Sequence, residues 1–436
     1  MSDEPMAGAA SHWITALGAR WYQRQAHHDP DIDPDALLQQ TRAADHLLKG
    51  RSLLSAAVVA PWGSHPIEAG PKFLETIRGE LERIRLQHRL LQPVVAVQVE
   101  QAIHYHGFLY PYDPAARRVH GFYEQHRPFD RHMSKCPSAI ADLQAMVDQS
   151  LPIPQHGQRA LVLGSCGSRN YGHWLLDDLS RLYLYLTHLG AGGDRTIRPP
   201  RRIVLPAFNP LIDERRTQAA RWLMEACSNR SMLLRPRAAG QQTRVVLQPN
   251  RRCYMVREAT LVSPASRHPY ELHPGAMLGL KQAAQRTLAG QPADGPRPKR
   301  VFISRRNNRT VLNLAGLEDL LGRFGFSTAY CEDLDFDGQR NLFAGADLVI
   351  GIMGAAMCNL IFAPEHCRVL FLAPEGWLDP LFHILMASMH MEARFIYCPV
   401  LVDGDDATSR SGQLTVPLAS VQTWLEDTTA RSSASS

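Results

Sequence analysis

The sequence predicts an α/β protein with a doubly wound parallel sheet in its C-terminal half. Short apolar strand patterns alternate with amphipathic helix patterns over residues 301–400, and the connections between them are short. The chain also has 436 residues, which is too long for one ordinary hydrophobic core. We therefore expect two domains, of which the second binds its ligand at the carboxyl ends of its strands.

The C-terminal elements follow one another with clear stop signals. Strand patterns occupy 301–304, 326–331, 347–352, 368–373 and 394–400, and helix patterns occupy 313–325, 337–346, 355–363 and 380–390. The first helix ends at Gly325, and the third stops before Pro364. This regular order predicts strand–helix units joined in parallel.

The N-terminal half alternates less regularly. Strand patterns occupy 94–100, 160–165, 202–206, 244–249 and 258–263, and an amphipathic helix pattern occupies 211–227. The stretch 289–300 is rich in Pro and Gly and is typical of a linker. We expect a helical appendage at 1–70, an α/β domain at 71–290, a linker at 291–300, a second α/β domain at 301–425 and a disordered tail at 426–436.

Composition and charge argue against several classes of protein. The net charge is +5, and the basic runs are short and lack interleaved aromatic residues, so we expect no nucleic-acid partner. The eight cysteines are scattered without a CxxC pair, unlike a zinc ribbon or a disulfide framework. No stretch resembles a membrane span or a secretory signal. We expect a cytoplasmic protein, and a peripheral contact with the inner face of the membrane stays open.

The segment 168–182, SRNYGHWLLDDLSRL, combines a leucine-lined face with a polar stripe. On an ideal helix the stripe consists of Asn170, His173, Asp177, Ser180 and Arg181. A carboxylate four residues after a His and four before an Arg can be held ionised and oriented by both, as a general base requires. The adjacent Trp174 is typical of a sugar site or a cleft rim. The alternative is an ordinary solvated helix face.

Two further motifs lie at predicted strand ends in the C-terminal half. In ISRRNNRTVLN, Arg305, Arg306 and Arg309 follow a strand, where arginine suits a pyrophosphate that it can grip with two hydrogen bonds. In VIGIMGAAMCN, Gly354 and Ala355 let a phosphate approach the backbone N–H groups at a helix start. A solvated loop and a tightly packed turn are the respective alternatives.

Two other patterns suggest sites that we do not favour. Asp333, Asp335 and Asp337 form a D-x-D array that could hold a divalent metal, but a helix-capping turn explains them better, so we expect no metal site. Cys166, in GSCGSRN close to His173, suggests a cysteine hydrolase. A small buried cysteine at a strand end is the favoured interpretation there.

Taken together, NYGHWLLDDLSRL, ISRRNNRTVLN and GQRNLFAGADLVIGIMGAAMCNLIFAP resemble glycosyltransferase family 61 in their order and separation. The resemblance covers roughly residues 90–400. It implies a GT-B-like architecture, in which two Rossmann-like domains face one another across a cleft. It also implies an inverting reaction without an obligatory metal, and the family includes plant xylan-decorating and bacterial capsule-biosynthesis transferases.

The resemblance assigns roles residue by residue. The general base falls on Asp177, with His173 orienting it or substituting for it and Asp178 as a nearby alternative. The residues implied to bind substrate are Asn170, Trp174 and Arg181. Those implied to bind the donor are Ser304, Arg305, Arg309, Asn313, Gln339, Gly354, Ala355 and Asn359. The arginines would neutralise the leaving diphosphate, as a metal does elsewhere.

We therefore expect an inverting glycosyltransferase with no obligatory cofactor. Its substrates would be a nucleotide-sugar, expected to be UDP-linked, and a glycan or lipid-linked acceptor in surface polysaccharide synthesis. Two departures from the family, Met353 where a His is frequent and Phe371 where an acidic residue is frequent, lie on the donor side. They leave open a degenerate fold that acts as a non-catalytic binding or scaffold protein, besides the Cys166-dependent hydrolase.

Overall fold

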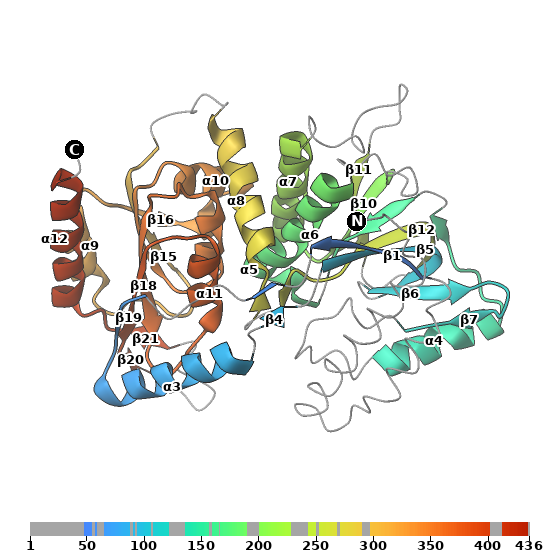
Figure 1. Cartoon of the computed structure of the whole chain (residues 1–436), viewed down its shortest axis with the longest axis horizontal. Coiled ribbons are helices and arrows are strands. Elements are labelled where there is room, and N and C mark those ends of the chain that lie inside the picture. Colours follow the sequence, from blue (N-terminus) through green and yellow to red (C-terminus); the bar gives the residue numbers. More distant parts are fainter. Residues whose placement is uncertain are drawn as a thin grey trace, which may run out of the picture. The chain divides into compact units, whose positions relative to one another are not determined.

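A computed structural model describes 48–54, 57–58, 65–87, 90–91, 94–105, 108–121, 136–156, 159–164, 166–189, 200–227, 243–249, 253–267, 271–289, 297–401 and 412–434. The chain divides into two compact units (Figure 1). The first comprises Met1–Val58 and Leu90–His268, and the second comprises Val59–Arg89 and Pro269–Ser436. The predicted boundary near residue 290 therefore differs from the division seen in the structure.

The first unit contains a mixed sheet. The strands of this unit are β1 (Leu48–Leu54), β2 (Ala57–Val58), β4 (Leu90–Leu91), β5 (Val94–Tyr105), β6 (Phe108–Asp113), β7 (Arg118–Val119), β8 (Gln155–His156), β9 (Ala160–Val162), β10 (Arg202–Ala207), β11 (Arg244–Pro249), β12 (Tyr254–Val262) and β13 (Ser266–Arg267), of which β2, β4 and β13 lie outside the mixed sheet. The main sheet runs β11-β10-β9-β12-β5-β6-β7, with β1 on β5 and β8 on β12. The β11-β10-β9-β12 part is parallel, whereas β5 and β6 pair antiparallel.

The helices of the first unit follow the parallel strands. They are α4 (Cys136–Asp148), η4 (Cys166–Arg169), α5 (Tyr171–His173), η5 (Trp174–Asp178), α6 (Leu179–Leu184), η6 (Tyr185–Leu189) and α7 (Pro210–Cys227). The series from η4 to η6 connects β9 with β10, and α7 connects β10 with β11. Both connections therefore begin at the carboxyl edge of the parallel strands, where this fold class places ligands.

The second unit contains the parallel sheet predicted for residues 301–400. The strands of this unit are β3 (Ile67–Glu68), β14 (Glu271–Leu272), β15 (Arg300–Ser304), β16 (Ser327–Tyr330), β17 (Leu348–Ile352), β18 (Arg368–Pro374), β19 (Ala393–Cys398), β20 (Val400–Leu401) and β21 (Gln413–Leu414), of which β14, β20 and β21 lie outside the parallel sheet. The main sheet runs β16-β15-β17-β18-β19-β3, and all neighbouring pairs are parallel. This confirms the α/β class and the parallel sheet.

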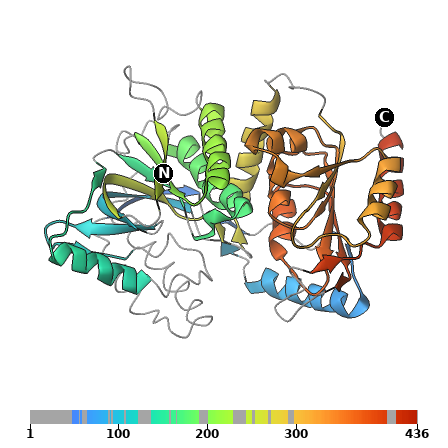
Figure 2. The same cartoon turned by 180° about the vertical axis from the view of Figure 1, so that it is seen from behind.

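Helices cover both faces of this second sheet (Figures 1 and 2). They are α3 (Pro71–Gln87), α8 (Pro274–Ala289), α9 (Leu314–Arg323), η7 (Cys331–Asp333), α10 (Phe336–Ala344), η8 (Ala355–Phe362), α11 (Pro380–Ser388) and α12 (Leu418–Ala434). Apolar residues of α9 and α12 pack with Ile350 and Leu370 into one core cluster. Burial of this kind outweighs weak local propensity.

Two segments differ from the sequence-based expectations. Within 1–70, β1 pairs with β5 and β3 pairs with β19, so the described parts of the expected appendage extend the two sheets. At the other end, α12 continues to Ala434 through most of the expected disordered tail. Leu425 and Thr428 are buried, and this packing orders a sequence that is rich in Ser and Thr.

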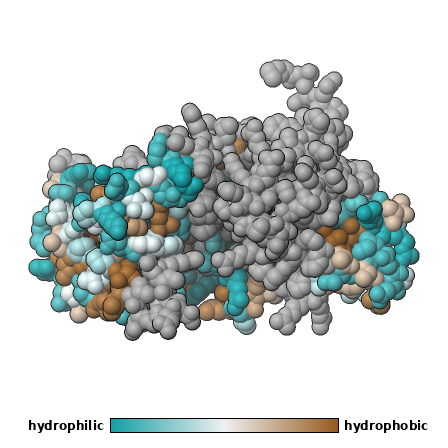
Figure 3. Space-filling view, turned by 90° about the horizontal axis from the view of Figure 1, so that it is seen from below, coloured by the Kyte–Doolittle hydropathy of each residue, from teal (hydrophilic) through white to brown (hydrophobic). Residues whose placement is uncertain are grey.

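In the part of the chain that the structure describes, no helix is long and apolar enough to cross a bilayer. On the face shown in Figure 3, hydrophilic and apolar described residues are interspersed.

Candidate functional site

The strand order of the second unit places two of the predicted motifs side by side, at the carboxyl ends of neighbouring strands. The chain runs from β15 to β16 on one side and then returns to β17 on the other, which makes β15/β17 the topological switch point of the sheet. Open α/β sheets bind ligands outside the carboxyl ends of the strands at such a point. Arg305–Arg309 follows β15 there, and Met353–Asn359 follows β17.

Arg305 and Arg309 converge on the turn after β17. Arg309 is buried, donates from Nη1 to the carbonyl oxygen of Met353, and lies with its Cζ 4.8 Å from the centre of the Trp377 ring. Arg305 lies directly against Gly354, since a Cβ atom added there would be 2.0 Å from Arg305 Nη1. The glycine is therefore needed to admit the guanidinium.

The Arg305 guanidinium has unused hydrogen-bonding capacity. Its Nη2 donates to Asn308 Oδ1 at 3.1 Å, whereas its buried Nε has no hydrogen-bond partner among the described residues. Burial lowers the pKa of Arg305, and the nearby Glu332 and Cys331 oppose that shift. A half-buried cation whose buried Nε donor is unfilled favours binding of an anion.

The loop that carries these arginines has an unusual backbone. Asn308 and Arg309 both have positive φ, at 28° and 56°, which non-glycine residues seldom adopt outside tight functional turns. Arg306 anchors the loop from outside, because it pairs with Asp333 and lies 4.0 Å from the centre of the Tyr330 ring. The loop after β15 is thereby tied to the segment after β16.

Three predicted donor-binding residues use their amides inside the second unit. Asn313 exchanges two hydrogen bonds with the backbone of Val416, at 2.8 and 2.9 Å. The buried Asn359 donates to Gln339 Oε1 at 2.8 Å, and Gln339 in turn donates to backbone carbonyls near η7. These contacts hold α10 against η8, so they support the turn after β17 from behind.

The two remaining donor-side residues lie at the edge itself. Ser304 is buried at the last position of β15, and Ala355 begins η8 directly after Gly354. The structure therefore brings Ser304, Arg305, Arg309, Gly354 and Ala355 together. It places Asn313, Gln339 and Asn359 in the supporting scaffold.

The D-x-D stretch forms the predicted helix cap. Asp335 caps the N-terminus of α10 and accepts a hydrogen bond from the backbone N–H of Gly338 at 2.8 Å. Asp333 pairs with Arg306, which lowers the pKa of its carboxyl, and Asp337 pairs with Arg340. Among the described residues, no group of three or more His, Cys, Asp or Glu side chains is placed to hold a metal.

In the first unit, the segment 168–182 folds as a series of short helices rather than one regular helix. Asn170 caps it, since its side chain accepts from the N–H groups of Gly172 and His173 at 2.9 and 3.4 Å. A π-helical stretch follows, in which the Leu179 N–H bonds to the Trp174 carbonyl five residues earlier. The additional residue in this turn changes the phase of the polar stripe.

This change of phase corrects the expected pairing of the arginine. Arg181 pairs with the Asp178 carboxylate, not with that of Asp177, and Ser168 donates to the other oxygen of Asp178. Arg181 is fully buried and also donates to the carbonyls of Val262 and Gly164, at 3.4 and 3.3 Å. Arg181 thus connects the carboxyl ends of β9 and β12 from within the core.

His173 and Asp177 do come together as predicted. The Nδ1 atom of His173 lies 3.9 Å from Oδ2 of Asp177, in an i,i+4 pair. The carboxylate is buried at 1 % exposure, whereas the His173 side chain is 22 % exposed. The imidazole is therefore the member of the pair that a substrate can reach directly.

Trp174 lies in the interior rather than at a rim. Its ring is fully buried, and the guanidinium of Arg216 in α7 lies 4.7 Å from its centre. Arg216 also donates to the Pro206 carbonyl and pairs with Asp213. Burial lowers the pKa of Arg216, and the carboxylates of Asp178 and Asp213 oppose this.

Met353 and Phe371, the two residues that depart from the family pattern, both lie in the core. Phe371 is fully buried in the middle of β18 and stacks on Phe395, with ring centres 4.7 Å apart. Met353 is also fully buried, and it is its backbone carbonyl that Arg309 contacts. The side chain of Cys166, on which the hydrolase alternative depends, lies outside the described part of the chain.

Two residues at the candidate sites, Trp377 and Arg216, were not predicted from the sequence. Trp377 follows β18, so a tryptophan just after a predicted strand was the available signal. Arg216 looked like one charge of an amphipathic helix, and its burial depends on contacts with Trp174 and Phe208 that no local pattern reveals.

Comparison with known proteins supports the resemblance drawn from the motifs. Residues 171–370 match the family model Glycosyltransferase 61. A segment is 30% identical over 103 residues, 23% of this chain, to the β-1,2-xylosyltransferase XAX1 of Oryza sativa subsp. japonica, and covers 18% of that protein. Another match, 28% over 86 residues, is to the α-1,3-arabinosyltransferase XAT3 of the same organism and covers 19% of this chain and 15% of the relative. The aligned parts thus span less than a fifth of either relative.

The matched range has a clear relation to the structure. It begins at Tyr171, directly after the Asn170 cap, and ends within β18. It therefore contains the His173–Asp177 pair of the first unit and both segments of the β15/β17 switch point, the arginine-bearing loop after β15 and the glycine turn after β17. The family model thus matches parts of both units.

Proposed function

We propose that this chain is an inverting glycosyltransferase that takes a sugar from a nucleoside-diphosphate donor. The convergence of Arg305 and Arg309 on Gly354 at the β15/β17 switch point carries the proposal. Two guanidinium groups beside a glycine turn can neutralise a leaving diphosphate, with backbone N–H groups available at the start of η8. The family match and the transferase names of both relatives support the same class of reaction.

The reaction needs one proton acceptor and one anion-stabilising site. The acceptor hydroxyl oxygen attacks the anomeric carbon while the bond from that carbon to the diphosphate oxygen breaks. The hydroxyl proton goes to the base, the electron pair leaves with the nucleoside diphosphate, and the anomeric configuration inverts. Stabilising the developing charge on the leaving diphosphate is the main task of the arginines.

We assign the proton transfer to the His173–Asp177 pair as a unit. Asp177 is buried, so it is placed to orient the imidazole and stabilise its protonated form. His173 is the accessible member and would receive the proton. The sequence had favoured Asp177 as the base itself, and the difference in exposure between the two side chains favours this division of roles.

We also propose a domain arrangement, donors and a cellular context for this reaction. A GT-B-like arrangement would let the two units share one reaction, with the donor on the second and the acceptor on the first. Both relatives are named as pentosyltransferases, so UDP-xylose and UDP-arabinose are the first donors to test. A glycan or lipid-linked acceptor in surface polysaccharide synthesis, at the inner face of the membrane, is the proposed context.

Thermal unfolding in the presence of nucleotides tests the proposal. A ligand that binds only the folded chain raises its melting temperature, so saturating UDP should stabilise the protein with or without EDTA. Arg305→Ala should abolish that shift. Arg323→Ala is the matched control, because Arg323 is an exposed arginine in the last turn of α9 in the same unit and belongs to neither segment of the β15/β17 switch point.

A second readout separates binding from transfer. His173→Asn should keep the UDP-induced shift and lose transfer of the sugar to acceptor, measured as UDP release from UDP-xylose or UDP-arabinose. The proposal fails if no nucleoside diphosphate stabilises the chain, or if Arg305→Ala and Arg323→Ala behave alike.

A further inference from the structure

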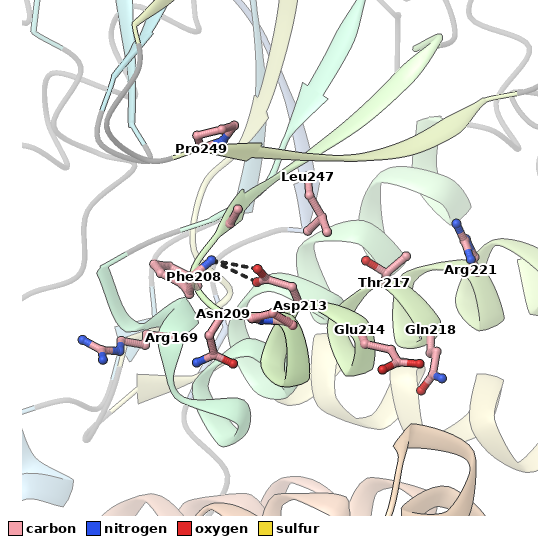
Figure 4. Close-up of a pocket in the computed structure, with 12 residues that line it drawn as sticks. Arg169, Phe208, Asn209, Asp213, Glu214, Thr217, Gln218, Arg221, Leu247 and Pro249 are labelled. Carbon is pink, nitrogen blue, oxygen red and sulfur yellow. Dashed lines mark hydrogen bonds between the residues drawn. The ribbon is translucent and has the colours of Figure 1, made fainter.

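A groove on the first unit lies where three neighbouring parallel strands end (Figure 4). Arg169 belongs to η4 after β9, Phe208 and Asn209 follow β10, and Leu247 and Pro249 lie at the end of β11. The groove has a volume of about 950 Å³. That volume is near the upper end of the roughly 300–1,000 Å³ typical of ligand pockets.

One face of α7 forms the long side of this groove. Its lining residues on that face are Pro210, Glu214, Thr217, Gln218 and Arg221. They recur at helical spacing, and Pro210 and Arg221 are separated by about 16 Å along the helix axis at 1.5 Å per residue. An elongated groove of this kind fits a chain of several sugar rings better than a single small molecule.

The side chains in the middle of the groove suit hydroxyl groups. Thr217 Oγ1 is buried and has no hydrogen-bond partner among the described residues, although helical threonines commonly donate to the preceding turn. Thr187 shows the usual arrangement, with its hydroxyl 2.8 Å from the Tyr183 carbonyl. The exposed Glu214 carboxylate lies one turn before Thr217 and makes no hydrogen bond or ion pair within the described part.

The charge pattern favours an uncharged ligand. Asp213 accepts two hydrogen bonds from the Phe208 N–H, at 3.1 and 2.9 Å, and pairs with Arg216, so its carboxylate is already compensated. Glu214 carries the remaining negative charge of the lining, and Arg169 and Arg221 add positive charges, so the groove presents groups of both signs that can hydrogen-bond to sugar hydroxyls without selecting for a polyanion. Phe208 and Leu247 add apolar surface of the kind that packs against sugar rings.

We propose that this groove binds an uncharged oligosaccharide as the acceptor. The assignment of the acceptor role rests on the proposed function, because it links the groove to the candidate base. Arg169, at one end of the groove, is four residues from His173 along the chain and directly precedes the Asn170 cap. The growing end of the oligosaccharide would lie at this end, and its preceding sugars would lie along α7.

Titration calorimetry on the full chain tests the proposal with defined sugars. The probes are xylohexaose and cellohexaose as uncharged chains, the matching disaccharides, and hexagalacturonate as a polyanion. We expect saturable binding of at least one uncharged hexasaccharide, at least tenfold tighter than its disaccharide. Glu214→Ala should weaken it by about tenfold or more, and Thr217→Val by about two- to tenfold, in line with lost hydrogen bonds to charged and neutral groups.

Matched controls separate the groove from general effects on the fold. Glu225→Ala changes an exposed glutamate of the same helix outside the groove, and Thr187→Val makes the same substitution in a helical threonine of the same unit. Both should bind the hexasaccharide like the unmodified chain. Equal melting temperatures of the groove variants and the unmodified chain would establish that the loss is local.

The outcomes are decisive and separate from those for the donor site. The proposal is overturned if neither hexasaccharide binds, if hexagalacturonate binds more tightly, or if Glu214→Ala and Thr217→Val bind like their controls. UDP binding by the same samples reports the second unit independently. If Glu214→Ala abolishes sugar binding while UDP binds none of the samples, the groove remains an oligosaccharide site and the proposed transferase activity is refuted.

Discussion

Replacing Gly354 by alanine tests whether the turn after β17 exists to admit Arg305. The added Cβ would lie 2.0 Å from Arg305 Nη1, and ordinary contact begins near 3.4 Å, so the guanidinium must move by about 1.4 Å. The contacted atom is the end of a flexible side chain, and the φ of Gly354 is an extended value that alanine also adopts. We therefore expect the chain to keep its fold and lose affinity for UDP.

The size of the effect follows from the bond that is displaced. A hydrogen bond between a guanidinium and an anion contributes roughly 1.5–3 kcal/mol, which corresponds to about 10- to 100-fold in the dissociation constant. Calorimetric titration of UDP into the Gly354→Ala variant measures this loss, and thermal unfolding without ligand measures stability. The melting temperature without ligand should change by only a few degrees.

Gly322→Ala is the matched control for this substitution. Gly322 lies inside α9 with open space where its Cβ would be, so alanine should stabilise the helix by up to about 1 kcal/mol and leave UDP binding unchanged. Unaltered UDP affinity in Gly354→Ala would refute the close approach of Arg305. Loss of the fold in that variant would refute the argument that the clash is confined to a flexible side chain.

Further predictions concern buried groups of the second unit. Burial lowers the pKa of His383 to about 3, so the folded chain resists protonation of this imidazole. The free energy of unfolding should therefore be independent of His383 above pH 6.5 and should fall by about 1.4 kcal/mol per pH unit between pH 6.5 and 3. His383→Gln should flatten this slope in urea unfolding. Burial also lowers the pKa of Lys281 to about 8, so the penalty for burying its charge shrinks as the pH rises through this range. Between pH 8 and 9 the unmodified chain should gain about 1 kcal/mol of unfolding free energy relative to Lys281→Met, a comparison in which the opposing effect of the buried thiols with raised pKa largely cancels. Asn359→Ala removes the donor to the buried Oε1 of Gln339 and should lower the unfolding free energy by about 1–3 kcal/mol, measured by urea titration against Asn307→Ala at an exposed position.

The regular parts of the fold were predictable because local pattern and burial agree there. The strands of the second unit are continuous apolar runs, and the connecting helices carry clear stop signals such as Gly325, which adopts a positive φ of 73°. Their alternation therefore predicts a parallel sheet and places Arg305 and Gly354 at one edge. The division of the chain into units was less accessible, since it depends on pairings between segments far apart in sequence.

The parts of the candidate site that lie at strand ends were predictable from the sequence. The pairing and burial of side chains in the segment 168–182 were not. Asp177 and Asp178 lie four and three residues before Arg181, so both can reach it on a helix, and spacing alone does not show that Arg181 pairs with Asp178. Composition likewise predicts a solvated stripe, whereas Arg181 is enclosed because backbone carbonyls at two strand ends satisfy it. The groove beside α7 depends on β10 and β11 ending together, which only the sheet order reveals.

The parallel pairing of β3 with β19 has a consequence for how the protein is made. Glu68 pairs with Arg394, and Phe73 in α3 contacts Tyr397 edge to face, so an early segment completes an edge formed about 300 residues later. At roughly 5–20 residues per second, a ribosome needs about 15–60 s to supply that partner. During this interval residues 65–87 are exposed on the nascent chain without their docking surface. A recombinant fragment that starts at residue 269 would lack them permanently and leave the β19 edge open to association with other copies.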